Sequence, residues 1–348
     1  MLDLSSYNAE KSKIMGDVKD YISKLEKCKE ISSSVNLPLH FDEYIGKLNG
    51  VVKSLMDDKV RVSVIAEVSN GKSTFLNALI FKDNILDAGI GETTARLYRI
   101  SYGERFALMY KGSTKEFNSL EDIKEFIKKL NKETLEKAEQ SKDGKKILNI
   151  SEDELNVYIY MPLEQLKVGI ELIDTPGFGT LNEELMMKFI ESAINLSDAV
   201  ITILDISQGT KKSEAEKFAN LLSMIRPDKR YIIFNKIDAY EEEEESFEVV
   251  GREVIKLMND ILNKQEYDAR IEIEQLFYLS SKFALKGFIK RAKREEIDEK
   301  TKKYMDKFED FEKKFWNDVI NYKQREFLSG NCLLYTSDAA DERSRVDL

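Results

Sequence analysis

The chain has 348 residues, of which 34% are charged and 42% are hydrophobic, and its formal net charge is −10. This acidic balance argues against nucleic-acid binding, because phosphate contacts need a basic face, and one His with two Cys excludes zinc sites, disulfide frameworks and histidine catalysis. No apolar run approaches the roughly 20 residues that span a bilayer, and no signal peptide opens the chain, so we expect a cytoplasmic protein.

Two helical patterns precede residue 59, and Leu37-Pro38 separates them because proline breaks helices. We therefore expect an N-terminal helical segment over residues 1–58. The apolar residues at helical spacing are Ile14, Val18, Tyr21, Ile22 and Leu25 in the first pattern and Phe41, Ile45, Leu48, Val52 and Leu55 in the second.

The next segment has the pattern of a phosphate-binding loop. Residues 60–65 predict a buried strand, residues 75–80 favour a helix, and the loop between them ends in Gly71-Lys72-Ser73. We expect Lys72 to reach the β- and γ-phosphates of a nucleotide, Ser73 to ligate Mg²⁺, and loop N–H groups to form an anion nest. Ala66 replaces the first Gly of this motif, which affects the turn but removes no ligand. The expected phosphate-binding residues are Glu67, Val68, Ser69, Asn70, Gly71, Lys72, Ser73 and Thr74.

A second candidate segment, Gly89 to Thr94, lies between that helix and the apolar strand over residues 97–102. One threonine is expected to ligate Mg²⁺ through its hydroxyl while its N–H meets the γ-phosphate, and we favour Thr94 over Thr93. The alternative is that both are turn residues.

The stretch from Thr94 to Asp174 is longer than one hairpin between two strands requires. It contains apolar runs over 106–110 and 157–161, a helical pattern over 120–135 and a charged linker through Lys146. We expect an antiparallel hairpin around Gly103 and Glu104. The length predicts an insertion in the nucleotide-binding domain.

The sequence Asp174-Thr175-Pro176-Gly177 ends an apolar strand over residues 168–173. We expect Asp174 to hold Mg²⁺ through water and the Gly177 N–H to meet the γ-phosphate. The next residue is Phe178, where small GTPases of the Ras kind place a glutamine that orients water. Because a phenyl ring cannot orient water, catalysis must use another group, a bound cation or a partner.

Residues 235–238 follow an apolar strand over 231–234 and predict the identity of the base. Guanine presents two N–H donors spaced for one carboxylate, here Asp238, whereas adenine offers no such pair. We expect the Lys236 stem to lie along the base and Asn235 to tie this loop to the phosphate-binding loop. A further loop, expected to offer an N–H to guanine O6, follows the strand over 277–279 and consists of Ser280, Ser281 and Lys282. The sequence therefore predicts GTP binding.

Strands alternating with helices predict an α/β fold with a mostly parallel central sheet covered on both faces. Apolar runs over 106–110 and 199–204 complete the set of expected strands. From Lys290 to Phe327 the chain is charged and has a helical pattern.

The final residues, 332–348, do not continue that helical pattern. The segment Cys332 to Glu342 resembles the translation of a sequencing-library adapter, and we expect 332–348 to be an artefact, with the natural protein continuing beyond Gly330. The alternative is a natural flexible tail.

Together, the motifs resemble the dynamin superfamily, specifically bacterial dynamin-like proteins, over roughly residues 40 to 290. The resemblance is carried by residues 66–74, 89–94 and 235–238 and by the block from Met161-Pro162 through Leu166 to Gly177. It implies a GTPase domain over 59–289 that binds GTP or GDP with Mg²⁺. It also implies a helical neck from 1–58 and 290–331, and lipid contact through a region beyond 331 at the inner membrane face.

The resemblance further implies how hydrolysis is stimulated. In that family the GTPase domains dimerise across the nucleotide, and a loop Ser with a Gly of the second segment holds a monovalent cation, K⁺ or Na⁺. Ser69 and Gly89 occupy those positions here. Together with the phosphate contacts expected above, this gives Ser69, Lys72, Thr94 and Gly177 as the expected catalytic residues. Eukaryotic members often position water with a loop Gln, but Val68 stands here, which leaves that role unassigned.

Two other functions remain open from the sequence. One is a soluble switch GTPase of the ribosome-assembly kind, which predicts a basic appendage that the acidic composition disfavours. The other is a GTP-regulated scaffold with negligible turnover, which Phe178 and Val68 keep open. The dependence of GTP turnover on protein concentration separates dimer-stimulated catalysis from a scaffold.

Overall fold

A computed structural model describes residues 4–34, 41–42, 44–46, 48–49, 52, 59–86, 96–136, 138–140, 146–148, 154, 156–176, 183–208, 212–240, 246–264, 270–272 and 275–321. The chain divides into two compact units, Val60–Phe315 and the combination of Met1–Lys59 with Trp316–Leu348. The described residues of each unit contain a hydrophobic core.

The unit that contains the N-terminus is built on helix α1, Leu4–Ser34. Val18 and Ile22 of α1 pack with Val52 in a small core, and Lys29 forms an ion pair with Asp42. The described residues between 41 and 52 are helical. These observations confirm both helical patterns, whereas the predicted break at 37–38 lies outside the described residues.

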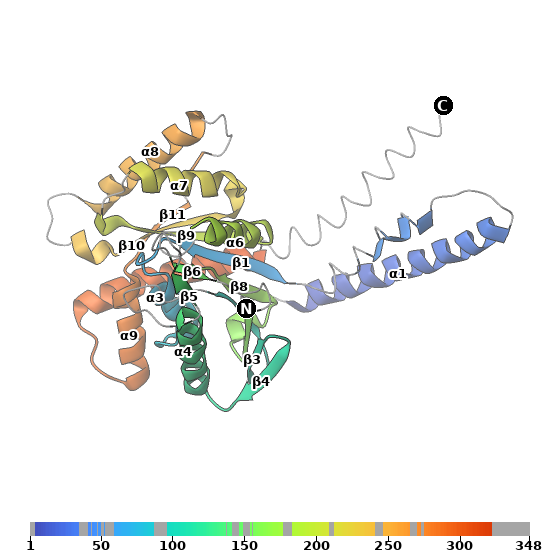
Figure 1. The fold of residues 1–348 in the computed structure, drawn as a ribbon, viewed down its shortest axis with the longest axis horizontal. Coiled ribbons are helices and arrows are strands. Elements are labelled where there is room, and N and C mark those ends of the chain that lie inside the picture. Colours follow the sequence, from blue (N-terminus) through green and yellow to red (C-terminus); the bar gives the residue numbers. More distant parts are fainter. Residues whose placement is uncertain are drawn as a thin grey trace. The chain divides into compact units, whose positions relative to one another are not determined.

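The larger unit is built on a nine-stranded sheet with the order β11-β10-β9-β1-β8-β2-β7-β3-β4 (Figure 1). Neighbours from β11 to β8 are parallel, as are β2 and β7, whereas β2–β8, β7–β3 and β3–β4 are antiparallel. The expected mostly parallel α/β sheet is thus confirmed. The strands are β1 Val60–Ala66, β2 Leu97–Tyr102, β3 Phe106–Tyr110, β4 Ser113–Phe117, β7 Asn156–Met161, β8 Ile170–Asp174, β9 Ala199–Asp205, β10 Arg230–Asn235 and β11 Leu276–Tyr278, with a separate pair of β5 Ala138–Gln140 and β6 Lys146–Leu148.

Helices cover both faces of this sheet (Figure 1). α6, α7 and α8 lie on one face, where their apolar residues form one core with those of β9 and β10, and α3, α4 and α9 lie on the other. The helices are α3 Lys72–Leu76, continued by the π-helix η1 Asn77–Phe81, α4 Leu120–Glu136, α6 Glu183–Asn195, α7 Lys212–Ser223, α8 Phe247–Lys264, α9 Ser281–Lys293 and a helix over 299–321; the 3₁₀ turns are η2 Glu164–Leu166, η3 Ile206–Gln208, η4 Pro227–Lys229 and η5 Ile237–Tyr240.

Aromatic side chains join α3 to the helix over 299–321. The Phe75 ring of α3 lies 5.6 Å from the Phe308 ring and 5.8 Å from the Phe311 ring, measured between centroids. At the end of η1, Lys82 Nζ lies 4.0 Å above the Phe288 ring and forms an ion pair with Glu312 at 2.5 Å. The helix that follows the phosphate-binding loop therefore packs against α9 and the helix over 299–321.

Three expectations about secondary structure are corrected. The hairpin around Gly103 and Glu104 is wrong, because β7 lies between β2 and β3 and pairs with both. Part of the expected charged linker forms β5 and β6. The helical pattern from Lys290 is interrupted, since α9 ends before Arg294, which has φ 58°, and a new helix starts after Asp298.

Candidate nucleotide-binding site

The predicted motifs meet at one edge of the sheet. β1 is flanked by β8 and β9, and β10 lies next to β9, all parallel. The carboxyl ends of parallel strands lie at the same edge, and open α/β sheets bind ligands there. The strand ends at Ala66, Asp174 and Asn235 therefore lie at the same edge although they are far apart in the sequence.

The backbone of the phosphate-binding loop has a conformation that requires glycine at position 71. Gly71 has φ 89°, and a Cβ there would lie 2.5 Å from Asn235 Nδ2, so a side chain would be strained and would clash. The loop closes through a hydrogen bond from the Asn70 N–H to the Glu67 carbonyl at 3.1 Å, despite Ala66 in place of glycine. α3 starts at Lys72, and none of the described side chains caps its first N–H groups.

Lys72 and Asp174, predicted to contact the phosphates and Mg²⁺, lie together. Lys72 Nζ forms an ion pair with Asp174 Oδ1, and the two side chains are 7% and 1% exposed. Burial raises the pKa of Asp174, and the neighbouring Lys72 counteracts only part of this effect. Asp174 Oδ2 is buried without a hydrogen-bond partner in the described part of the chain.

The unpartnered Oδ2 of Asp174 is a ligand atom of the kind that Mg²⁺ binds, so the residues present fit this ion. Hard cations bind carboxylate and hydroxyl oxygens, and Ser73, half-buried in the first turn of α3, is the other expected ligand at this edge. Thr175, which follows Asp174, donates from Oγ1 to the Val64 carbonyl at 2.8 Å and so fixes the end of β8 to β1.

Asn235 connects the two halves of the site. Its Nδ2 donates to the Asn70 carbonyl at 2.9 Å, and its Oδ1 accepts from the Ser281 N–H at 3.0 Å. Asn70 in turn donates from Nδ2 to the Ile203 carbonyl at 3.3 Å. The predicted tie between Asn235 and the phosphate-binding loop is confirmed, and the Ser281 N–H is engaged within the protein.

The residues predicted for the base lie around η5 and the start of α9. Asp238 Oδ1 is buried with no hydrogen-bond partner among the residues that the structure describes, and the same holds for Ser281 Oγ. Lys236, at φ 65°, forms an ion pair with Asp205. Ser280 caps α9 by accepting from the Phe283 N–H at 3.4 Å, and Lys282 is exposed.

Two contributors were not predicted from the sequence. Asp205 holds Lys236 and ends an apolar strand as Asp174 does, so its position was a usable signal. Asn77 is fully buried in η1, where Oδ1 accepts from the Leu86 N–H at 2.8 Å and Nδ2 donates to the Leu86 carbonyl at 2.9 Å. No local pattern distinguishes such an asparagine from a helix surface residue.

Several predicted positions lie outside the described residues. These are Gly89, Thr93, Thr94, Gly177, Phe178 and the tail over 332–348. Their assigned roles stay predictions.

Several known proteins are similar to this chain. A model of the dynamin family matches residues 62–237. Transmembrane GTPase Marf of Drosophila melanogaster is 25% identical over 321 residues, covering 87% of this chain and 37% of its own length. The bacterial dynamin-like protein of Nostoc punctiforme is 26% identical over 244 residues, covering 70% of this chain and 33% of its own length. The chain thus spans about a third of these curated relatives.

A solved structure has the same fold. It is described as "An oligomerised bacterial dynamin pair provides a mechanism for the long range sensing and tethering of membranes". The TM-score is 0.51 at 18% identity, over 98% of this chain and 58% of that one.

Proposed function

The chain belongs to the dynamin family, whose members are GTPases, and on this basis we propose that it binds GTP with Mg²⁺ and hydrolyses it to GDP and phosphate. Two buried carboxylate oxygens carry the proposal. Asp174 Oδ2 and Asp238 Oδ1 have no partner among the described residues, and burying a carboxylate oxygen without a partner is costly. They belong to the residues expected at the metal and at the guanine base.

In this proposal the phosphate end is bound by the loop over 67–74. Ser73, Asp174 and Thr94 would hold Mg²⁺, which when bound neutralises charge on the β- and γ-phosphate oxygens. Lys72, now paired with Asp174, exchanges that partner for phosphate oxygens. The base end is bound by Asp238 and Lys236.

We further propose that dimerisation of GTPase domains stimulates hydrolysis. Ser69 supports this proposal because it is exposed in the loop at φ 73°, where its oxygen is accessible to a monovalent cation. Val68 and Phe178 offer no group that orients water. Ser69, Lys72, Thr94, Gly89 and Gly177 are the residues proposed to act in the dimer, with K⁺ or Na⁺.

Coupling to membrane binding or remodelling is the part of the proposal that rests on relatives alone. One relative is called a transmembrane GTPase, and the solved structure concerns sensing and tethering of membranes. None of the helices that the structure describes has the length and hydropathy of a membrane span.

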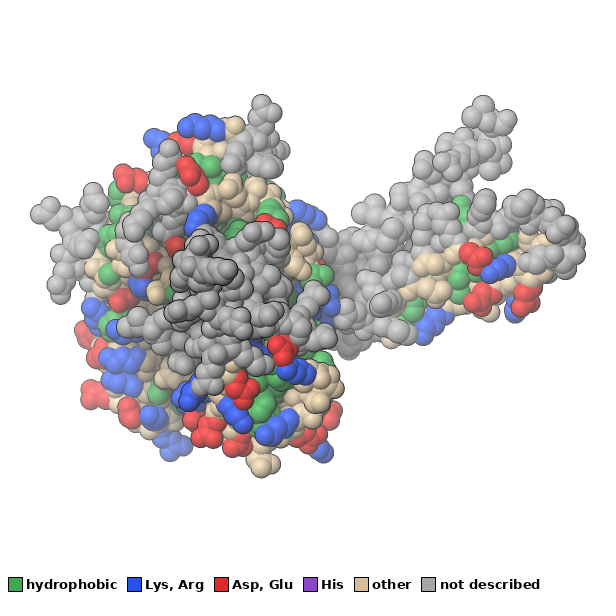
Figure 2. Space-filling model, viewed as in Figure 1, with side chains coloured by type: hydrophobic (Ala, Val, Ile, Leu, Met, Phe, Trp, Pro, Cys, Tyr) green, Lys and Arg blue, Asp and Glu red, His purple; other side chains and the backbone are tan. Residues whose placement is uncertain are grey.

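The alternative of a ribosome-assembly switch calls for a basic appendage. Figure 2 shows Lys and Arg side chains interspersed with Asp and Glu over the larger unit, and the described residues on the face drawn there form no extended basic area. Nucleic-acid binding is therefore not part of the proposal.

Calorimetric titration with GTP and GDP in the presence of Mg²⁺ tests the proposed binding. We expect Lys72→Ala to abolish binding, because the loop then lacks its cation for the phosphates. Lys167→Ala is the matched control, since Lys167 is exposed and pairs with Glu164 at 3.4 Å. Unchanged GTP affinity in Lys72→Ala contradicts the assignment of the phosphate-binding loop. Tight GTP binding by the wild-type chain without GTP hydrolysis favours the GTP-regulated scaffold.

A further inference from the structure

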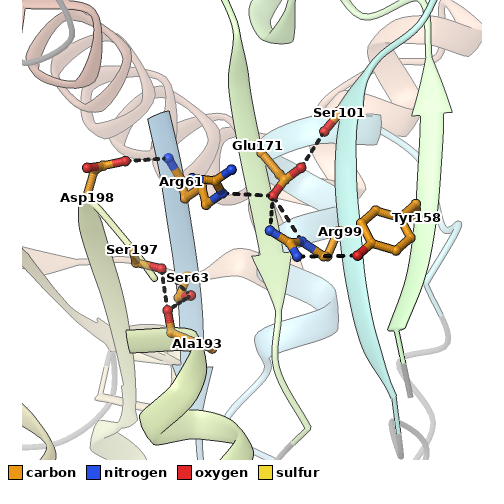
Figure 3. Close-up of polar contacts among 9 residues, drawn as sticks. All are labelled: Arg61, Ser63, Arg99, Ser101, Tyr158, Glu171, Ala193, Ser197 and Asp198. Atoms are coloured by element: carbon orange, nitrogen blue, oxygen red, sulfur yellow. Dashed lines mark hydrogen bonds and ion pairs between the residues drawn. The ribbon is translucent and has the colours of Figure 1, made fainter. Parts of the chain in front are cut away.

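A carboxylate buried in the central sheet gathers side chains from neighbouring strands (Figure 3). Glu171 of β8 is 2% exposed, and its Oε1 accepts from Arg99 Nε at 3.0 Å and Arg99 Nη2 at 2.5 Å. Its Oε2 accepts from Ser101 Oγ at 3.1 Å, and Arg61 Nε lies 3.5 Å from Oε1. Because Arg99 and Ser101 belong to β2 and Arg61 belongs to β1, the carboxylate links three adjacent strands.

This cluster lies where two parts of the sheet meet. The parallel strands β11 to β8 carry the loops of the candidate site, whereas β2, β7, β3 and β4 attach to them through the pairing of β2 with β8. That pairing has three residue pairs, with Tyr98 opposite Asp174, whereas β2 and β7 share six pairs. A short antiparallel pairing therefore decides where β2 begins relative to Asp174.

Hydrophobic patterning alone does not fix this register. A slip of β2 by two residues keeps every side chain on its own face of the sheet. It moves β2 by about 7 Å along β8. In the register present, Ser101 comes opposite Glu171. A slip in one direction carries both Arg99 and Ser101 away and leaves the buried carboxylate without partners on β2, which is strongly unfavourable. A slip in the other direction brings Arg99 opposite Glu171 but removes the hydrogen bond from Ser101 to Oε2. Glu171 therefore loses at least one partner on β2 in each slip that the patterning tolerates.

We infer that Glu171 is a positioning residue which, with Arg99 and Ser101, holds β2 in the register that places Tyr98 opposite Asp174. The inference rests on the proposed GTPase function, because β2 directly follows the segment predicted to meet the γ-phosphate. GDP binding uses loops on the parallel strands and is independent of this register. Steps that require the γ-phosphate depend on it.

Glu171→Gln tests the inference, since it keeps the size of the side chain and removes its charge. Glu116→Gln is the matched control, because Glu116 also pairs with an arginine of this sheet, Arg105 at 3.1 Å, but is 63% exposed on β4. We expect Glu171→Gln to lower kcat at saturating GTP by about 10- to 100-fold with GDP affinity unchanged. We expect Arg99→Lys, which keeps the charge, to retain more kcat than Arg99→Met.

Hydrogen exchange of the β2 amides without nucleotide separates a failure of this inference from a failure of the proposed function. Faster exchange over residues 97–102 in Glu171→Gln, but not in Glu116→Gln, supports the register role even if the wild-type chain binds no GTP. Unchanged exchange and wild-type kcat overturn the inference. So does a parallel loss of GDP affinity, kcat and folded protein, because the cluster then only stabilises the sheet.

Discussion

At Asp238, one oxygen atom is buried with no protein partner in the described part of the chain. A carboxylate in that state is costly unless a ligand supplies donors. Guanine offers two N–H donors to one carboxylate, whereas xanthine carries an oxygen in place of the amine. In the proposed function, the carboxylate of this residue therefore selects guanine.

We expect Asp238→Asn to weaken GTP binding on the order of 10- to 100-fold, because a hydrogen bond to a charged group is lost. Binding of XTP rises, since the amide donates to the xanthine oxygen. Competition of both nucleotides against a fluorescent GDP analogue measures the change. Asp260→Asn, at an exposed position of α8, is the control, and wild-type preference for GTP in Asp238→Asn contradicts the guanine assignment.

At the scale of elements, the helix over 299–321 depends on the residue that starts it. Asp298 Oδ1 accepts from the Thr301 N–H at 2.8 Å and Oδ2 accepts from Thr301 Oγ1 at 2.9 Å, which is the geometry of an N-cap. Lys286 and Lys290 of α9 each lie 3.5 Å from Oδ2. The bonds to Thr301, followed by these lysines, hold the pKa of Asp298 well below its usual range.

This lowered pKa gives the cap a pH dependence of known sign. A carboxyl whose folded pKa is depressed stabilises the fold above its unfolded pKa, and that stability is lost as the pH falls toward the folded pKa. We expect Asp298→Ala to lower the thermal midpoint at neutral pH and to approach the wild type progressively below about pH 4. At neutral pH the thermal midpoint of Asp298→Asn, which still caps the helix, lies between those of Asp298→Ala and the wild type. A pH-independent difference between Asp298→Ala and the wild type rules out this origin.

The local sequence predicted where the strands lie in the chain better than it predicted which strands pair with one another. Apolar runs and motif boundaries located β1, β8 and β9, because those strands are buried on both faces. The position of β7 between β2 and β3 was missed, since strand pairing is set by distant residues. β4, Ser113–Phe117, was missed because an exposed edge strand has no apolar alternation.

The same contrast holds at the site. The motif chemistry predicted the contact of Asn235 with the phosphate-binding loop, because that amide has a fixed role. Asp205 was missed although it ends an apolar strand as Asp174 does. Glu171 acts through strands that only the folded sheet brings together, so no spacing in the sequence pointed to it.

For the whole molecule, the proposed dimer-stimulated hydrolysis would make turnover a property of two chains. We expect the specific GTPase activity to rise with protein concentration in K⁺ or Na⁺, because association completes each site. The rate falls when a bulky organic cation replaces them, since Ser69 and Gly89 then lack an ion that fits. Steady-state phosphate release over a dilution series measures both effects. A flat and very slow rate contradicts dimer stimulation.

Asn235 has a wider consequence for how a ligand is held. One amide group touches the phosphate-binding loop through the Asn70 carbonyl and the base-binding loop through the Ser281 N–H. We therefore expect order imposed at one end to be transmitted to the other without passing through the ligand. In the proposed nucleotide complex, the nucleoside and polyphosphate halves would then bind cooperatively, each reducing the entropy that the other must give up.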